Sequence, residues 1–180
     1  MDDQEAVRSA LGEMLGVYGY QVELHESADA FLASPGAGEV GCVIADVRMP
    51  GTDGIALVRE LAQRGIDAPV VLISGHADVP MAVAGLKAGA QDFIEKPVDD
   101  VRLVAAINRS LAFRFERLTP REMEVFDLVA EGMTSQAIAT QLGISARTVE
   151  SYRAQLMEKL QLDSVASIVR LAVKLGRVTP

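Results

Sequence analysis

A short apolar run that ends in one aspartate constrains the fold of this chain more than any other feature. Residues 42–45 (Cys-Val-Ile-Ala) lead directly into Asp46, and a Met-Pro-Gly turn follows at 49–51. Short apolar runs bounded by turn residues are typical of strands buried on both faces of a parallel sheet. Asp46 would then lie at the carboxyl end of its strand, where open α/β sheets bind ligands. A lone aspartate there is also a common turn residue, so whether Asp46 is functional depends on the other motifs in the chain.

Other polar residues follow apolar runs in the same way. The run 70–73 precedes Ser74, the apolar pair 93–94 leads through Glu95 to Lys96, and the pair Asp2-Asp3 precedes a helical pattern. If the strands are parallel, these groups meet at one edge of the sheet. Clustered carboxylates repel one another unless a cation lies among them, and an all-oxygen set suits Mg²⁺. Carboxylates, Mg²⁺ and a lysine together favour phosphoryl transfer to an aspartate.

Hydrophobic periodicity predicts alternating strands and helices in the first part of the chain, which indicates a doubly wound parallel sheet. The predicted helices are 4–18, 28–33, 53–64 and 79–88, and the predicted strands are 20–24, 42–46, 70–73 and 92–95. Residues 98–119 contain no glycine or proline and keep a helical spacing, so we expect a stiff connecting helix. Two helices with a kink near Ser110 or Arg117 are the alternative.

The last third of the chain has the pattern of a helix-turn-helix domain. Thr119 and Glu122 form a capping box with Pro120 at the first helical position. Helices are predicted at 120–131, 135–142, 146–160 and 164–175. A short helix, a glycine turn and a capped longer helix are typical of DNA-binding helix-turn-helix proteins.

A helical wheel divides the predicted helix 146–160 into a core face and an outer face. Val149, Leu156 and Leu160 form the core face, whereas Arg147, Glu150, Ser151, Ala154 and Glu158 face away. On the outer face, Arg147 would contact phosphate or guanine and Glu150 would accept from a cytosine amine. Residues on the flanks suit the DNA backbone: Thr148, Tyr152 and Lys159, with Arg153 either contacting phosphate or forming a local ion pair.

The charge is divided unevenly. Residues 1–116 carry 9 Lys/Arg and 18 Asp/Glu, whereas residues 117–180 carry 8 and 7. Any nucleic-acid contact is therefore expected in the second part. The chain has one cysteine, no run of 18 apolar residues and no basic leader, so we expect no membrane span or signal peptide and a cytoplasmic location.

Together these motifs resemble two-component response regulators of the NarL/FixJ type. The motifs are Asp2-Asp3, 46–50 (Asp-Val-Arg-Met-Pro), 74–76 (Ser-Gly-His), 92–97 (Asp-Phe-Ile-Glu-Lys-Pro) and the LuxR-like stretch 142–150. The resemblance implies a flavodoxin-like receiver domain with its linker helix at 1–116 and a LuxR-type helix-turn-helix domain at 117–180.

By this resemblance the chain is a transcription regulator and not an enzyme. Asp46 would accept a phosphoryl group from a sensor histidine kinase, with Mg²⁺ held by Asp2, Asp3, Asp46 and the backbone carbonyl of Arg48. Lys96 and Ser74 would bind the phosphoryl oxygens, Phe93 would follow the motion of Ser74, and the Lys96-Pro97 bond would be cis. The face formed by 79–115 would pair two receivers on double-stranded DNA, and RNA polymerase is a further candidate partner.

One departure from the family pattern leaves alternatives open. Only Met1 precedes Asp2, where the family has an apolar first strand at the centre of its sheet. The chain would then be truncated, rearranged or completed by a partner chain. A rival function is therefore a phosphorylation-independent DNA-binding or dimer-blocking protein. An aspartate-dependent phosphohydrolase is disfavoured, because Arg48 stands where such enzymes have a second acid.

Overall fold

The chain forms two compact units, residues 1–110 and residues 111–180. The computed structural model describes residues 1–37, 40–76, 78–160, 162 and 164–178. Within these residues, no helix is both long and apolar enough to span a membrane.

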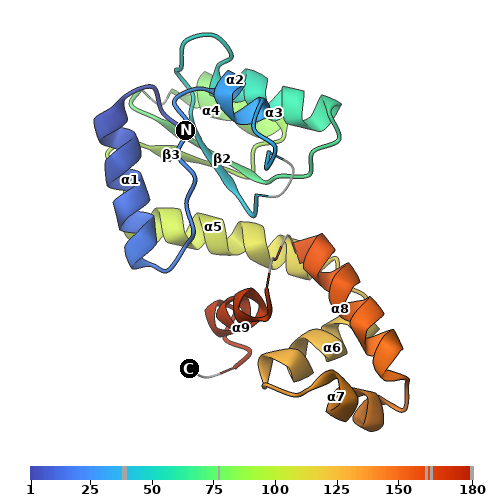
Figure 1. Ribbon diagram of the computed structural model, residues 1–180. Coiled ribbons are helices and arrows are strands. Elements are labelled where there is room, and N and C mark those ends of the chain that lie inside the picture. The colour runs from blue at the N-terminus through green and yellow to red at the C-terminus, as the bar shows by residue number, and fades with distance from the viewer. Residues whose placement is uncertain (38–39, 77, 161, 163, 179–180) are drawn as a thin grey trace. The chain divides into compact units, whose positions relative to one another are not determined.

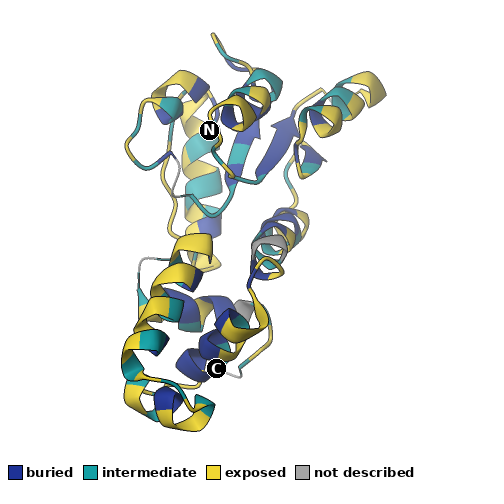
Figure 2. Cartoon of the chain, turned by 90° about the vertical axis from the view of Figure 1, so that its right-hand side faces the viewer, coloured by how far each residue is buried: buried dark blue, intermediate teal, exposed yellow. Residues whose placement is uncertain are grey.

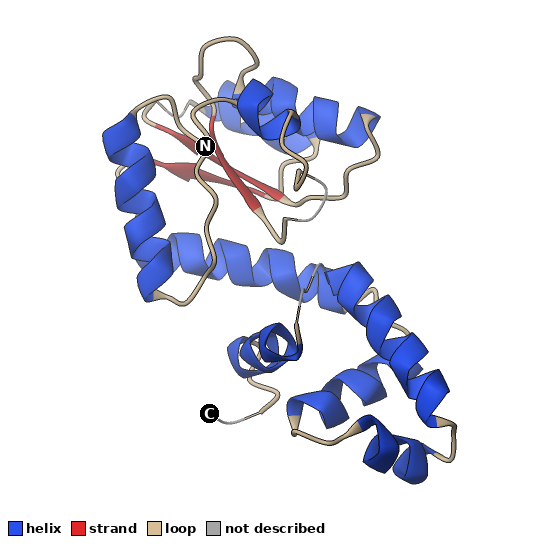
Figure 3. Cartoon of the chain, in the orientation of Figure 1, coloured by secondary structure: helices blue, strands red, loops and turns tan. Residues whose placement is uncertain are grey.

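A parallel sheet forms the centre of the first unit. Its strands are β1 (Val43–Asp46), β2 (Val70–Ser74) and β3 (Asp92–Glu95), in the spatial order β1-β2-β3. The strands are drawn in red in Figure 3, and Figure 2 shows them mostly buried. Every residue of β2 is buried, as expected for a central strand covered on both faces. The predicted strands around Asp46, at 70–73 and at 92–95 are confirmed.

Helices cover the sheet on both sides (Figure 1). They are α1 (Glu5–Val17), α2 (Ala28–Leu32), α3 (Gly54–Gln63), α4 (Val79–Ala88) and α5 (Asp100–Phe115). Side chains of Ser27, Asp53 and Asp78 cap the first turns of α2, α3 and α4 by accepting from backbone amides. Gly85 allows α4 to lie close to the sheet, because a Cβ there would be 2.7 Å from Leu72 Cδ1.

The predicted strand at 20–24 is wrong. These residues follow α1 without regular secondary structure. An extended segment becomes a strand only when a neighbouring strand pairs with its backbone. Among the described residues the sheet consists of β1, β2 and β3, and none of these strands pairs with this segment. Side chains hold the start of the segment to α5 instead, with the hydroxyl of Tyr20 donating to Asn108 Oδ1 at 2.7 Å.

Met1 pairs with β1 through its backbone. Its nitrogen donates to the carbonyl of Ile44 at 2.7 Å, and its carbonyl accepts from the amide of Asp46 at 3.0 Å. This is the alternation of a parallel ladder, on the edge of β1 that faces away from β2. The acidic pair that follows Met1 is therefore attached to the sheet by main-chain hydrogen bonds.

The second unit is helical. It contains α6 (Pro120–Ala130), α7 (Ser135–Leu142), α8 (Ala146–Leu160) and α9 (Val165–Lys174), packed on a core that includes Phe126, Ile138, Val149, Leu156 and Ile168. The capping box of Thr119 and Glu122 is present with Pro120 at the first helical position. The predicted connecting helix corresponds to α5, which continues through Ser110 and ends at Phe115. A single connecting helix is therefore confirmed, and it ends four residues before the predicted limit at Thr119.

Candidate functional site

Lys96 joins two carboxylates at the carboxyl edge of the sheet. Its Nζ donates to Asp2 Oδ2 at 2.6 Å and makes a short hydrogen bond to Asp46 Oδ2. Asp2 is fully buried, Asp46 is 5% exposed, and the side chain of Lys96 is 19% exposed. Charged groups are rarely buried to this extent unless they are paired. The three residues therefore form one partly buried ionic group.

The backbone explains why these residues meet. Asp46 is the last residue of β1, and Lys96 follows the last residue of β3. The amide of Lys96 donates to the carbonyl of Ser74 at 2.8 Å, which places Lys96 beside the end of β2. On the other side of Asp46, a Cβ at Gly54 would lie 2.4 Å from the Asp46 carbonyl oxygen. Only glycine permits α3 to begin this close to the aspartate.

Both carboxylate oxygens of Asp46 have hydrogen-bond donors. Oδ1 accepts from the amide of Arg48 at 2.9 Å, and Oδ2 accepts from Lys96. Burial lowers the pKa of Lys96, but the hydrogen bonds from its ammonium to Asp2 and Asp46, and the charges of both, raise it further, so the net pKa lies above 10.5. Lys96 is therefore a cation at neutral pH and lies in direct contact with Asp46.

The other predicted receiver residues are buried to different extents. Ser74 is fully buried, and its Oγ donates to the carbonyl of His76 at 3.2 Å and accepts from the His76 amide at 3.3 Å. Phe93 is 8% exposed and belongs to the core of the sheet. Asp3 is exposed. The Lys96-Pro97 bond is cis, as expected.

The oxygen groups at this edge suit a Mg²⁺ ion. The buried carboxylates of Asp2 and Asp46 already converge on the same cation, the ammonium of Lys96. Asp3 adds a third carboxylate next to Asp2 in the chain, and hard divalent cations prefer such oxygen ligands. In the described part of the chain, no three acidic, histidine or cysteine side chains are already gathered as a metal site. A metal would thus compete with Lys96 for two of the carboxylates.

Sequence reasoning missed Arg8, which lies in the first half of α1. Its Nη1 donates to the carbonyl of Asp2 at 2.8 Å and to the carbonyl of Asp3 at 3.1 Å. The spacing from the acidic pair to Arg8 is five or six residues, and no sequence motif used above marks it. A long cationic side chain near the start of α1 was the only available signal.

In the second unit, α7 and α8 form the predicted helix-turn-helix. Gly143 ends α7 in the left-handed conformation, with φ of 68°. Ser145 Oγ then accepts from the amide of Thr148 at 3.0 Å and caps the first turn of α8. The helical wheel is confirmed, because Val149, Leu156 and Leu160 are buried and the five residues assigned to the outer face are exposed.

Glu150 has partners on both helices of the motif. Ser135, the first residue of α7, makes a short hydrogen bond to its Oε1, and Arg153 Nη1 donates to the same oxygen at 3.1 Å. Arg153 Nη1 also donates to Ser135 Oγ at 2.8 Å. The structure therefore gives Arg153 the local ion pair that was one of its two predicted roles. The contacts from Ser135 and Arg153 orient the Glu150 carboxylate on the exposed face of α8.

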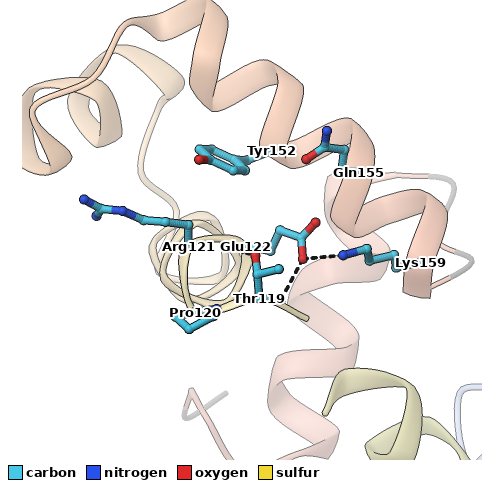
Figure 4. A pocket seen from close by; sticks show the side chains of 7 residues that line it. All are labelled: Thr119, Pro120, Arg121, Glu122, Tyr152, Gln155 and Lys159. Carbon is cyan, nitrogen blue, oxygen red and sulfur yellow. Dashed lines mark hydrogen bonds and ion pairs between the residues drawn. The ribbon is translucent and has the colours of Figure 1, made fainter. Parts of the chain in front are cut away.

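Lys159 connects α8 to the first turn of α6, as Figure 4 shows. Its Nζ donates to Glu122 Oε2 at 2.7 Å, and the same oxygen accepts from the amide of Thr119 at 2.7 Å. Glu122 is 2% exposed, whereas the side chain of Lys159 is 40% exposed. This pair lies in a shallow hollow between the start of α6 and the flank of α8, lined by Thr119, Pro120, Arg121, Glu122, Tyr152, Gln155 and Lys159.

Comparisons with known proteins agree with this geometry. Residues 1–108 match the family described as response regulator receiver domain, and residues 116–172 match the luxR family of bacterial regulatory proteins. The transcriptional regulatory protein FixJ of Azorhizobium caulinodans is 40% identical, covering 98% of this chain and 91% of that protein. The tetrathionate response regulatory protein TtrR of Salmonella typhimurium is 38% identical, with the same two coverages.

Solved structures of response regulators are similar to this chain over nearly its whole length. Full-length FixJ from B. japonicum is similar with a TM-score of 0.54 and 38% identity, covering 99% of this chain and 96% of that one. The response regulator StyR gives a TM-score of 0.55 and 34% identity, with coverages of 97% and 96%. Receiver and DNA-binding parts thus match in the same order along the whole chain. The chain belongs to the response regulators of transcription in which a receiver domain is joined to a LuxR-type DNA-binding domain.

Proposed function

We propose that Asp46 accepts a phosphoryl group from a sensor histidine kinase, and that the phosphorylated chain binds double-stranded DNA as a dimer. In this proposal residues 1–116 act as the receiver with its linker helix, and residues 117–180 act as the DNA-binding domain. Because DNA is the target, the proposed place of action is the cytoplasm. The observation that carries the proposal is the ammonium of Lys96 held between the carboxylates of Asp2 and Asp46.

The transfer step requires a charged nucleophile at the edge of the sheet. An oxygen of the Asp46 carboxylate attacks the phosphorus of a phosphohistidine, the P–N bond breaks, and the histidine nitrogen takes a proton. Mg²⁺, when bound by Asp2, Asp3, Asp46 and the carbonyl of Arg48, would offset charge on the transferring group. Lys96, which already contacts Asp46, would then pair with a phosphoryl oxygen as a point charge.

Ser74 and Phe93 are the proposed switch. The hydroxyl of Ser74 would leave the His76 carbonyl and donate to a phosphoryl oxygen, which would draw the loop after β2 toward Asp46. Phe93 packs under α4, where the position of a Cβ on Gly85 is 3.6 Å from Phe93 Cδ2. A movement of the loop that precedes α4 would therefore change the packing around this ring. Phosphorylation then shifts a population between two packed states.

An apolar stripe on α4 supports pairing of two receivers through the 79–115 face. Val79, Val83 and Leu86 are 77%, 42% and 49% exposed and recur at helical spacing. Val101 at the start of α5 is 68% exposed. Contiguous exposed apolar side chains favour association. A dimer formed there would bring two copies of α8 to DNA half-sites about one helical turn apart.

On DNA, the exposed face of α8 would enter the major groove. Arg147, Glu150, Ser151 and Ala154 are the proposed base-reading residues, and all four are exposed. Thr148, Tyr152 and Lys159 would contact the backbone from the flanks, and Arg153 would do so only by releasing its pair with Glu150. Contact between the bound dimer and RNA polymerase is a further proposed step.

A second function remains a proposal because of one observation. The described residues of the sheet form three strands, and the outer edge of β1 is paired through Met1. A receiver of this kind would be a fixed scaffold for a phosphorylation-independent DNA-binding or dimer-blocking protein. The two functions differ in whether Asp46 becomes labelled and whether labelling changes assembly.

The deciding experiment is incubation of the whole chain with acetyl phosphate or phosphoramidate, with and without Mg²⁺, followed by intact mass and size-exclusion chromatography. The proposal expects one Mg²⁺-dependent phosphoryl group and a shift toward dimer. Asp46→Asn is the matched control and should show neither. Labelling that persists in Asp46→Asn, or no labelling of the wild type while it still binds DNA, would favour the second function.

A further inference from the structure

We infer that Arg8 is a positioning residue for the acidic pair, and that it acts as a clamp by donating hydrogen bonds to the backbone carbonyls of both Asp2 and Asp3. This inference rests on the proposed Mg²⁺-dependent function of the same site. Neither the family motifs nor the charge of Arg8 assigns it this role.

The clamp consists of two hydrogen bonds from one nitrogen. Nη1 of Arg8 lies 2.8 Å from the carbonyl oxygen of Asp2 and 3.1 Å from that of Asp3. Because consecutive carbonyls are held by the same guanidinium, the peptide between the two acids is restrained in its orientation. The direction in which the Asp3 side chain leaves the backbone is restrained with it.

Apart from Arg8, the contacts that hold the acidic pair are made by Met1 and Asp2, including the hydrogen bond from Lys96 to the buried carboxylate of Asp2. Met1 before it has two backbone hydrogen bonds to β1. Gln4 after it is the N-cap of α1 but provides no side-chain cap, and its amide donates to Asp2 Oδ1 at 3.0 Å. Across the described residues, the structure gives the exposed carboxylate of Asp3 no hydrogen bond or ion pair. Among the described residues, Arg8 therefore supplies the side-chain contact that ties the backbone of Asp3 to α1.

Charge and geometry predict opposite effects, which makes the role testable. If Arg8 acted only through its positive charge, removing it would strengthen Mg²⁺ binding, because like charges repel. If Arg8 positions the acids, removing it weakens Mg²⁺ binding, as losing groups that orient metal ligands generally does. The sign of the change in affinity separates the two roles.

The test compares wild type, Arg8→Met and Arg59→Met by Mg²⁺ titration followed by NMR. Arg59 is an exposed arginine on α3 and serves as the matched control for loss of one positive charge. Arg8→Met is expected to weaken Mg²⁺ binding about 10-fold or more, while Arg59→Met leaves it near the wild-type value. Unchanged or tighter binding in Arg8→Met would overturn the inference.

Amide hydrogen exchange on the same samples provides a readout without metal. The amides of Gln4 and Asp46, which donate to Asp2 Oδ1 and to the Met1 carbonyl, are expected to exchange about 10-fold faster in Arg8→Met. The amide of Val47, which donates to Ile73 across β1 and β2, should keep its rate and report that the fold is intact. If wild type binds no Mg²⁺, the proposed function fails, whereas unchanged exchange at Gln4 and Asp46 would overturn the clamp itself.

Discussion

The ammonium of Lys96 lies 2.6 Å from a carboxylate oxygen of Asp2, although the two residues are 94 positions apart in the chain. This contact joins the N-terminal segment to the loop after β3, and Asp46 completes the group from β1. The candidate phosphoacceptor is therefore paired with a cation before any phosphoryl group arrives. Any cation or phosphoryl group that enters must exchange contacts with Lys96.

Lys96→Met is expected to destabilise the first unit, because it leaves the buried carboxylates of Asp2 and Asp46 without a counter-charge. Breaking one partner of a buried ion pair lowers the free energy of unfolding by roughly 3 kcal/mol. Urea denaturation near neutral pH without Mg²⁺ measures this change. Lys87→Met, an exposed lysine on α4, is the matched control and should change stability by about 0.5 kcal/mol or less. Equal losses in both variants would contradict the prediction.

The stability that Lys96 provides should depend on pH only in the alkaline range. Its pKa in the folded chain is raised above 10.5, so its contribution is fully present below pH 10.5 and is lost as the pH rises through the folded pKa. The difference in unfolding free energy between wild type and Lys96→Met should therefore be constant from neutral pH to 10.5 and shrink above it. Denaturation curves of both proteins over this range test the sign. A difference that grows with rising pH would refute it.

Glu122→Gln should destabilise the DNA-binding unit and reduce its sensitivity to acid. Burial raises the pKa of Glu122, but hydrogen bonds from Lys159 and Thr119 lower it further, so the net pKa lies below 4.5. Its stabilisation is present above pH 4.5 and is lost as the pH falls through the folded pKa. At neutral pH, we expect a loss of about 1–3 kcal/mol from the broken cap and ion pair.

Thermal unfolding at several pH values measures this effect. Glu124→Gln is the matched control, because Glu124 forms an exposed pair with Arg121 on the same helix. Exposed pairs contribute about 0–1 kcal/mol. If the two variants were equally stable at neutral pH, the buried position of Glu122 would not have the predicted importance.

Glu150→Gln should change which DNA sequence is preferred more than it changes affinity for DNA in general. The carboxylate that Ser135 and Arg153 orient would accept from a cytosine amine, and its loss should relax discrimination at one base pair by about 1–3 kcal/mol. Selection from randomised duplex DNA, followed by competition binding, measures this preference. Glu131→Gln, an exposed acid at the end of α6, is the control. An unaltered base preference would exclude Glu150 from base reading.

Leu86→Asp should prevent dimer formation by the phosphorylated chain while leaving labelling of Asp46 intact. It places a charge in the apolar stripe of α4, where Leu86 is 49% exposed. Val17→Asp, at an 87% exposed position at the end of α1, is the control for a charge added elsewhere. Analytical ultracentrifugation of each labelled protein distinguishes them. A normal dimer in Leu86→Asp would place the interface on another surface.

Local patterns in the sequence were sufficient to predict most of the helices and strands. Strands β1 and β2 consist mainly of apolar residues, β3 contains the apolar pair 93–94, and the capping box at Thr119 and Glu122 is a contact between residues three apart. The wheel of α8 depends only on helical spacing, so its buried and exposed faces were also predictable. Such features require no knowledge of distant segments.

Contacts between distant segments needed the tertiary structure. Residues 20–24 have an alternating pattern but form no strand, because a strand requires a backbone neighbour that the local sequence does not supply. The pattern around Asp2, Asp46 and Lys96 predicted that they would meet, but not that Lys96 would bond both carboxylates. The contacts of Arg8 with two carbonyls, and of Lys159 with Glu122, depend on where helices place long side chains. Hydrophobic periodicity carries no information on that placement, so only the folded chain decided it.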